Sequence, residues 1–214
     1  MTLNIFPLHL SGKIIRVTIE APVLDEWGRL VDCIFPTPIL FFVQDTPLSW
    51  AEINGELHGM DANPVDFFEG LLSAIICLTN AEQCSLEELR KLWLENALSL
   101  GFEVENESCF YLTNLGIQYN WYLFERLGYK LRIHYHNDWG SGTKGVVEVP
   151  FVEFARDSIT MAETFAMVLM KNLNAIKSYL LKNGCDPSIF GFDESTIERL
   201  FKYIKTLKET IFRG

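Results

Sequence analysis

The chain has 214 residues, of which 49% are hydrophobic and 13% aromatic, and its formal net charge is −10. This composition excludes a disordered chain, because enough apolar surface is available to offset the entropy lost on ordering, and the length suffices for a sizeable core. The negative charge repels phosphate backbones, so we expect no nucleic-acid partner.

Neither a targeting signal nor a membrane span is indicated by the sequence. The first residues, Met1-Thr2-Leu3-Asn4, lack the basic region and the apolar run of a signal peptide, and no window has the roughly 18 uncharged apolar residues of a membrane helix. The cysteines are odd in number and include no C-x-x-C pair. We therefore expect a cytoplasmic protein without a cofactor, a zinc site or a disulfide framework, and with reduced, mostly buried thiols. The cysteines are Cys33, Cys77, Cys84, Cys109 and Cys185.

Strands are predicted in the N-terminal part of the chain. Residues 2–9 and 14–21 are expected to form a hairpin, because β-branched residues are frequent in the second segment. Residues 38–44 form a short apolar run between two prolines, which predicts a buried strand. Residues 45–61 have no strong periodicity and are expected to be a loop that contains Trp50.

The acidic middle of the chain predicts two helices. Asn63 can cap the first helix, with Pro64 at the first helical position and apolar residues at helical spacing over 65–78. A capping box, Ser85-Leu86-Glu87-Glu88, is expected to open the second helix, and Gly101 is expected to end it.

The second half of the chain predicts three strands followed by two helices. Turns separate the strands, and each helix is expected to begin with a capping box, Thr160-Met161-Ala162-Glu163 for the first and Ser195-Thr196-Ile197-Glu198 for the second. The expected strands are 120–126, 130–136 and 145–149, and the expected helices run from 160 to about 182 and from 195 onward.

Together these elements predict an α+β fold in which about four helices pack on one antiparallel sheet. Most helices follow the strands, which disfavours a doubly wound parallel sheet. Because no segment rich in Pro, Gly or Ser divides the chain, we expect a single domain over residues 1–214. Subdomains over 1–115 and 116–214 are the alternative.

The residue pattern His134-Tyr135-His136-Asn137-Asp138 is the sharpest candidate for chemistry. Alternation along a strand places His134 and His136 on one face, about 6–7 Å apart. Two imidazoles at this spacing, with Asp138, could hold a metal ion, as in a metal-dependent hydrolase. We favour the other interpretation, in which the histidines face solvent or pair with cross-strand Glu125. The core residues of this strand are then Leu131, Ile133 and Tyr135.

Other catalytic patterns are missing from the sequence. The glycine-rich segment 140–145 lacks the order of a phosphate-binding loop and precedes a strand. There is no G-x-S-x-G motif, and no cysteine lies in an activating context. We therefore expect a protein that is not an enzyme.

Acidic residues are concentrated in one part of the chain. Residues 61–115 carry ten acids against Arg90 and Lys91, whereas residues 116–214 carry thirteen bases against eleven acids. An acidic face suits a basic protein partner, although a merely solvated face is the alternative. Tryptophans in expected loops, which include Trp27, are candidate interface anchors. The predicted binding residues are Glu87, Glu88, Glu95, Glu103, Glu105, Glu107, Trp50 and Trp139.

Four segments carry a resemblance to a known class of protein. They are Trp121-Tyr122-Leu123, residues 130–135, residues 147–154 running into a long helix, and the helical residues 66–72. These segments resemble bacterial proteins of the immunity type, encoded beside polymorphic or contact-dependent toxins. The resemblance implies a cytoplasmic inhibitor that binds and blocks a cognate toxin domain, and it supplies no catalytic residue. An oligomeric adaptor protein is a further alternative.

Overall fold

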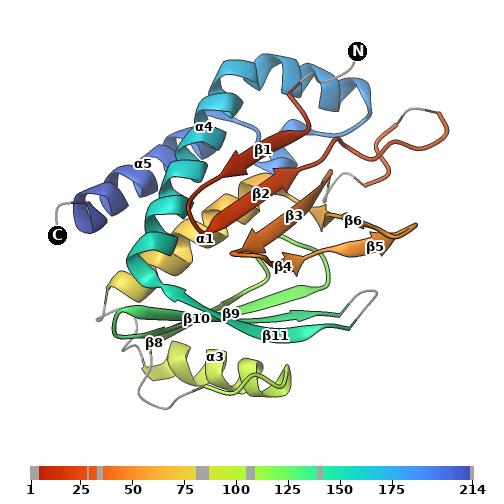
Figure 1. Cartoon of the computed structure of the whole chain (residues 1–214). Coiled ribbons are helices and arrows are strands. Elements are labelled where there is room, and N and C mark those ends of the chain that lie inside the picture. Colours follow the sequence, from red (N-terminus) through yellow and green to blue (C-terminus); the bar gives the residue numbers. More distant parts are fainter. Residues whose placement is uncertain are drawn as a thin grey trace.

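The computed structural model describes residues 5–27, 29–32, 36–80, 87–104, 109–138 and 142–212. Within these ranges the protein has an α+β fold with two antiparallel sheets, a small β-hairpin and four α-helices (Figure 1). The predicted fold class is therefore confirmed. The helices are α1 (Pro64–Thr79), α3 (Glu87–Ser99), α4 (Phe151–Lys182) and α5 (Glu194–Ile211), with a short 3₁₀ helix, η1 (Pro187–Phe190), between the last two.

The N-terminal strands form a five-stranded sheet. Strand β3 (Thr37–Val43) lies inside the sheet order β1-β2-β3-β4 and also pairs with β7 (Met60–Ala62). The predicted N-terminal hairpin is present as β1 (Leu8–Ser11) and β2 (Ile15–Ile19), and β4 covers Thr46–Ser49. Alternation in β2 buries Ile15, Val17 and Ile19, as the pattern of the sequence indicates.

The prediction of a loop over residues 45–61 is wrong. This segment contains β4, the two-stranded hairpin of β5 (Ala51–Ile53) and β6 (Glu56–His58), and most of β7. Each of these strands has only three or four residues. A run this short does not show a recognisable alternation of apolar and polar residues, so periodicity does not separate it from a loop.

The central strands form a separate four-stranded sheet in the order β11-β10-β9-β8. The three predicted strands are present, but the expectation that they share one sheet with the N-terminal strands is wrong, and β8 was not predicted. The strands are β8 (Cys109–Thr113), β9 (Asn120–Leu127), β10 (Lys130–Asn137) and β11 (Lys144–Pro150). Side chains link the two sheets: the Tyr122 hydroxyl donates to the Leu48 carbonyl at 3.2 Å, and Asn137 Nδ2 donates to the Trp50 carbonyl at 2.8 Å.

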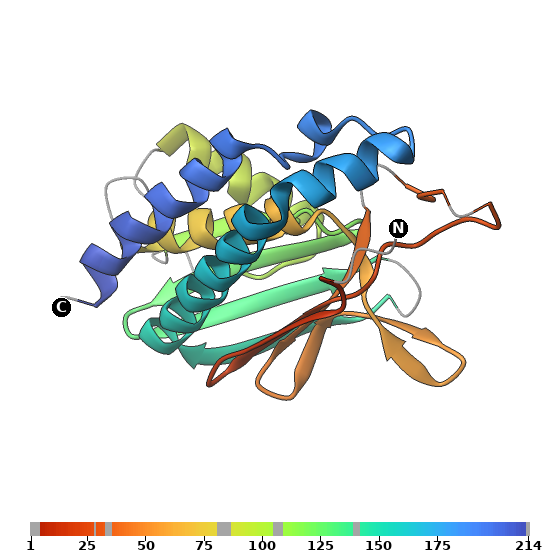
Figure 2. The same cartoon turned by 90° about the horizontal axis from the view of Figure 1, so that it is seen from above.

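Buried aromatic rings join the two sheets to the helices. Phe41 of β3 contacts Phe67 of α1 and Tyr122 of β9, with ring centroids 5.3 and 6.2 Å apart. Phe67 contacts Phe68 at 5.1 Å, and Phe68 stacks on Phe165 of α4 at 4.6 Å. All five side chains are completely buried. Figure 2 shows α1, α4 and α5 along one side of the strands, where these rings form the centre of the main core.

Helix α1 begins as predicted. Asn63 is its N-cap, and its side-chain oxygen accepts from the amides of Val65 and Asp66 at 3.0 and 3.4 Å. Pro64 occupies the first helical position, where the missing N–H leaves no hydrogen bond unmade.

The starts of α4 and α5 differ from the prediction. α4 begins at Phe151, directly after Pro150, so the strand continues into the helix without a loop. Thr160, the expected cap, lies inside the helix, where its hydroxyl donates to the Arg156 carbonyl at 2.8 Å. α5 is capped by Asp193 rather than by Ser195, because Asp193 Oδ1 accepts from the Thr196 amide at 2.8 Å.

The state of the cysteines also differs from the expectation. Cys109 and Cys185 are each disulfide-bonded. Cys77 is a buried thiol, and burial raises its pKa. The expectation of reduced thiols is therefore wrong for Cys109 and Cys185. Folding brings disulfide partners together across large sequence separations, and spacing alone does not reveal them.

Two glycines allow close approach between backbone segments. A Cβ atom at Gly59 would lie 2.5 Å from the carbonyl carbon of Ile39 and 2.8 Å from the amide nitrogen of Leu40. Gly116 has a φ of +63°, and a Cβ atom there would lie 2.5 Å from Asp66 Cβ. Only glycine fits these two positions without a backbone shift.

Among the described helices, none combines the length and the apolar character that crossing a membrane requires.

Candidate functional site

Helix α3 covers the face of the four-stranded sheet that points away from α1 (Figure 1). The sequence segment after α3 runs back along the same face. Of the side chains that the structure describes, four buried ones form the contact, and half-buried residues such as Trp93 and Leu94 surround them. We call this cluster the α3 core; its buried members are Ala97, Phe102, Phe110 and Leu123.

The outer face of α3 combines acidic and apolar side chains. Residues follow one another by about 100° around a helix, so Glu95 points away from the buried Ala97. Leu92 and Leu98 flank Glu95, and they are 52% and 58% exposed. Glu103, which follows the helix, is also exposed.

The structure places the other predicted binding residues as follows. Glu87 and Glu88 form the first turn of α3, but their side chains lie outside the described part of the chain. Trp50 is half-buried between β4 and β5, so it does not belong to the α3 surface. Glu105, Glu107 and Trp139 are not among the described residues.

A buried ion pair lies on the face of the sheet that α3 covers. Alternation along β10 points Arg132 and His134 toward this face, while Leu131 and Ile133 are buried in the main core. Glu125 of β9 is completely buried, and its Oε2 lies 3.1 Å from His134 Nε2 and 3.5 Å from Arg132 Nη1. The predicted pairing between His134 and Glu125 is confirmed. A carboxylate buried at this depth requires such partners, because an unpaired buried charge is strongly destabilising.

The ion pair continues to the edge of the sheet. Arg132 Nε donates to Glu148 Oε1 at 2.9 Å, and Lys130 Nζ donates to Glu148 Oε2 at 3.3 Å. The hydrogen bond from Arg132 is the main cause that lowers the pKa of Glu148. Arg132 thus lies between a buried carboxylate and an exposed one, and neither carboxylate depends on a metal ion for charge compensation.

His136 pairs with a different carboxylate from the one that pairs with His134. Its Nε2 lies 2.7 Å from Asp138 Oδ1, and its buried Nδ1 has no hydrogen-bond partner among the described residues. His134 and His136 share a face of β10, as predicted, but the Nε2 atom of each bonds to a different carboxylate. Across the ranges described above, no group of three or more His, Cys, Asp or Glu side chains is arranged to hold a metal ion.

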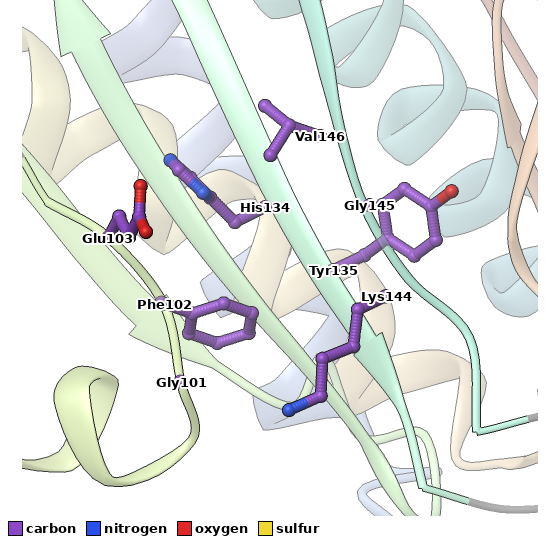
Figure 3. A pocket seen from close by; sticks show the side chains of 8 residues that line it. All are labelled: Gly101, Phe102, Glu103, His134, Tyr135, Lys144, Gly145 and Val146. Atoms are coloured by element: carbon purple, nitrogen blue, oxygen red, sulfur yellow. The ribbon is translucent and has the colours of Figure 1, made fainter.

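A cavity of about 240 Å³ opens beside the ion pair, between the segment after α3 and strands β10 and β11 (Figure 3). The Phe102 ring forms part of its wall and lies 6.0 Å from the His134 ring. Lys144 extends along the opposite side and donates to the Leu100 carbonyl at 3.2 Å. The cavity therefore presents a cation, an imidazole and the exposed carboxylate of Glu103 around an apolar surface. Among the described residues, no serine, threonine or cysteine lines it.

Two features of this site were missed from the sequence. One is the burial of Glu125, and the other is Phe102, which joins α3 to the histidines. The sequence of β9 contains a usable signal, because Trp121 and Leu123 are apolar on the face opposite Tyr122 and Phe124. A strand that is apolar on both faces indicates a layer on each side.

Comparison with protein-family models, with curated proteins and with solved structures gave no match for this chain.

Proposed function

We propose that this protein is a non-enzymatic inhibitor of the immunity type, which binds a basic toxin domain through the outer face of α3. The observation that carries the proposal is the combination of side chains on that face. Exposed Leu92 and Leu98 flank the acidic Glu95, and exposed Glu103 follows at the cavity mouth. Interfaces between proteins typically have an apolar centre with a polar rim.

The charge of the chain supports a basic partner. A net charge of −10 attracts a cationic protein over a distance and increases its rate of association. Acidic side chains on the docking face add specificity, because a like-charged surface is repelled. The two leucines add apolar area that loses its contact with water on binding, which favours a lasting complex.

The cytoplasm is the proposed location, since immunity proteins meet their toxins there. The disulfides of Cys109 and Cys185 count against it, because the cytoplasm keeps most thiols reduced. Alkylation of thiols during cell lysis, followed by mass spectrometry, decides the question. Modification of Cys109 and Cys185 in unreduced lysate would support the cytoplasm, and protection of both would assign the protein to an oxidising compartment.

A metal-dependent hydrolase that uses His134, His136 and Asp138 has less support. Each imidazole already bonds to a carboxylate through Nε2. A metal bound by both rings would require these hydrogen bonds to break, or both rings to bind through Nδ1. The buried Glu125 would then lose a partner, at a cost.

The test is the affinity for the toxin domain encoded beside this protein, measured by calorimetry. We expect the Glu95→Lys, Glu103→Lys double variant to weaken binding at least about tenfold, because two attractions become repulsions. The matched control is Glu52→Lys, Glu56→Lys, which makes the same charge change on the exposed β5–β6 hairpin. Equal losses in both variants would contradict the proposed face, and no binding by the unmodified protein would contradict the proposed function.

A further inference from the structure

Three polar side chains around the cavity beside α3 retain hydrogen-bonding capacity that no described residue uses. The cavity measures about 240 Å³ and lies between the segment after α3 and strands β10 and β11 (Figure 3). The three side chains are those of Glu103, His134 and Lys144, and Phe102 and Val146 line the same cavity. These polar groups can therefore bind a molecule that enters from solvent.

His134 supplies a hydrogen-bond acceptor. Its side chain is only 7% exposed, and its Nε2 lies 3.1 Å from Oε2 of Glu125, which also pairs with Arg132 as an ionised carboxylate does. Because an ionised carboxylate only accepts hydrogen bonds, Nε2 carries the hydrogen, and Nδ1 of the neutral ring has the lone pair. No described residue donates to this Nδ1. The lone pair is thus available to a donor on a ligand.

Lys144 and Glu103 add one charge of each sign. The Lys144 ammonium has three hydrogens, of which one goes to the Leu100 carbonyl at 3.2 Å. Both charged side chains are exposed, and neither forms an ion pair with another described residue. The cavity can therefore bind an anionic group at Lys144 and a cationic donor at Glu103, and hydrogen bonds between ionised groups are the stronger ones.

The two charges lie at different ends of the cavity. In the register of the sheet Val146 is opposite His134, and Lys144 precedes Val146 by two residues. Two residues of a strand span about 6–7 Å. Figure 3 shows the Phe102 ring between the Lys144 ammonium and the Glu103 carboxylate. A ligand that reaches both ends must therefore carry its anionic group and its donor on opposite sides of a spacer.

The surface between the two ends is apolar. The Phe102 ring is buried, its centroid lies 6.0 Å from that of the His134 ring, and Val146 is 53% exposed. A ring in the ligand can pack against Phe102 in an offset or edge-to-face arrangement. The cavity is smaller than pockets that bind drug-sized molecules, so it suits a single ring with a small group at each end. An α-amino acid carries both charged groups on one carbon and is too short.

We propose that this cavity binds a small amphoteric ring compound. Its carboxylate pairs with Lys144, its amino group donates to Glu103 and to His134 Nδ1, and its ring covers Phe102 and Val146. The bound compound joins the segment after α3 to β10 and β11. The proposal is independent of the inhibitor function, because it requires no protein partner. Since Glu103 also belongs to the proposed docking face, the experiment uses this protein alone.

The experiment is a titration of the whole chain with para-(aminomethyl)benzoate, followed by amide NMR. This probe has a carboxylate and an ammonium at opposite ends of a benzene ring. We expect saturable binding with a Kd of roughly 1 mM, as for other ligands of few atoms. The shifted amides should be those of residues 100–103, 134–135 and 144–146, which surround the cavity.

Two variants remove one charge each. Lys144→Met and Glu103→Gln should each weaken binding of the probe roughly tenfold, because each replaces an ionised partner at an exposed position. The matched controls are Lys171→Met on α4 and Glu52→Gln on β5, which make the same changes at exposed positions elsewhere. Both controls should bind the probe like the unmodified protein, and an equal loss in a variant and its control would overturn the assignment of that charge.

Two shorter probes test the proposed orientation. Benzoate lacks the amino group and benzylamine lacks the carboxylate, so the unmodified protein should bind each at least about tenfold more weakly than the complete probe. Lys144→Met should leave the binding of benzylamine unchanged, and Glu103→Gln should leave that of benzoate unchanged. The proposal is overturned if para-(aminomethyl)benzoate does not bind saturably, if the three probes bind equally well, or if the shifted amides lie away from the cavity.

Discussion

The two cores of this protein lie on opposite faces of one sheet and differ in construction. The main core spans both sheets, α1, α4 and α5, and its aromatic rings are completely buried. Within the described part of the chain, the α3 core has four buried side chains, and the ion pair of Glu125 and His134 lies beside it. The main core therefore determines the fold, whereas the α3 core only holds helix α3 against the four-stranded sheet.

This difference bears on function. An element held by few apolar contacts can open without unfolding the whole molecule, and binding elements are often taken from this less stable part of a structure. The proposed binding face is on α3, the helix with the smaller core. Movement of α3 thus leaves the aromatic centre of the main core intact.

The largest expected effect comes from the main core. Phe68→Ala removes a completely buried ring that contacts Phe67 and Phe165. We expect the free energy of unfolding to decrease by about 3–5 kcal/mol, because a cavity is left in addition to the lost burial. Chemical denaturation measures the change. A loss below about 1 kcal/mol would contradict the central role of these rings.

Phe102→Ala tests the α3 core. The ring is buried between α3 and the histidines, but α3 can detach, so we expect a loss of only about 2–3 kcal/mol, at or below the low end of the usual range for phenylalanine. Hydrogen exchange separates the two cores: amides of α3 should lose protection while those of α1 keep theirs. Equal loss in both helices would show that the cores unfold together.

Glu125→Gln removes the buried charge and retains the shape of the side chain. We expect a loss of roughly 1–3 kcal/mol, because the charge-assisted hydrogen bonds with His134 and Arg132 are weakened. Glu95→Gln, at an exposed site on α3, is the control and should change stability by less than about 0.5 kcal/mol. Thermal denaturation of both variants checks the contrast.

The smallest effect concerns the cap of α5, a helix of the main core. Asp193→Ala should cost about 1 kcal/mol at neutral pH, because the Thr196 amide loses its acceptor. That hydrogen bond is the main cause that lowers the pKa of Asp193 from its ordinary value of 3.8. The stability it contributes is present above the ordinary pKa and is lost as the pH falls through the lowered one. The difference between variant and unmodified protein should shrink over that range, whereas Asp193→Asn should behave like a cap at every pH.

The sequence predicted much of the fold where local patterns are long. The cap at Asn63, the three central strands and the long C-terminal helices follow from spacing and from residues that act on their neighbours. Prediction from the sequence failed where an element depends on a partner that is distant in the chain. Three-residue strands such as β5 exist because β6 pairs with them, and no local pattern marks Cys109 and Cys185 as disulfide-bonded.

The candidate site was predicted only in part. The faces of His134 and Glu95 follow from alternation and helical spacing, which are local. The burial of Glu125 depends on α3 folding over the sheet, and the exposure of Leu92 and Leu98 depends on which face of α3 docks. Neither depends on nearby residues alone. Hydrophobicity indeed points to the leucines as core, whereas the structure leaves them exposed.

Gly59 has a consequence for ancestry and for engineering. Because a Cβ atom at position 59 would collide with the backbone of Ile39, any residue other than glycine there would displace β3. In saturation mutagenesis, position 59 between β6 and β7 and position 116 beside α1 should tolerate fewer substitutions than the residues around them. Any other sequence that shares this arrangement should carry glycine at both equivalent positions. Two residues without side chains thus form a signature by which kinship with this protein can be tested.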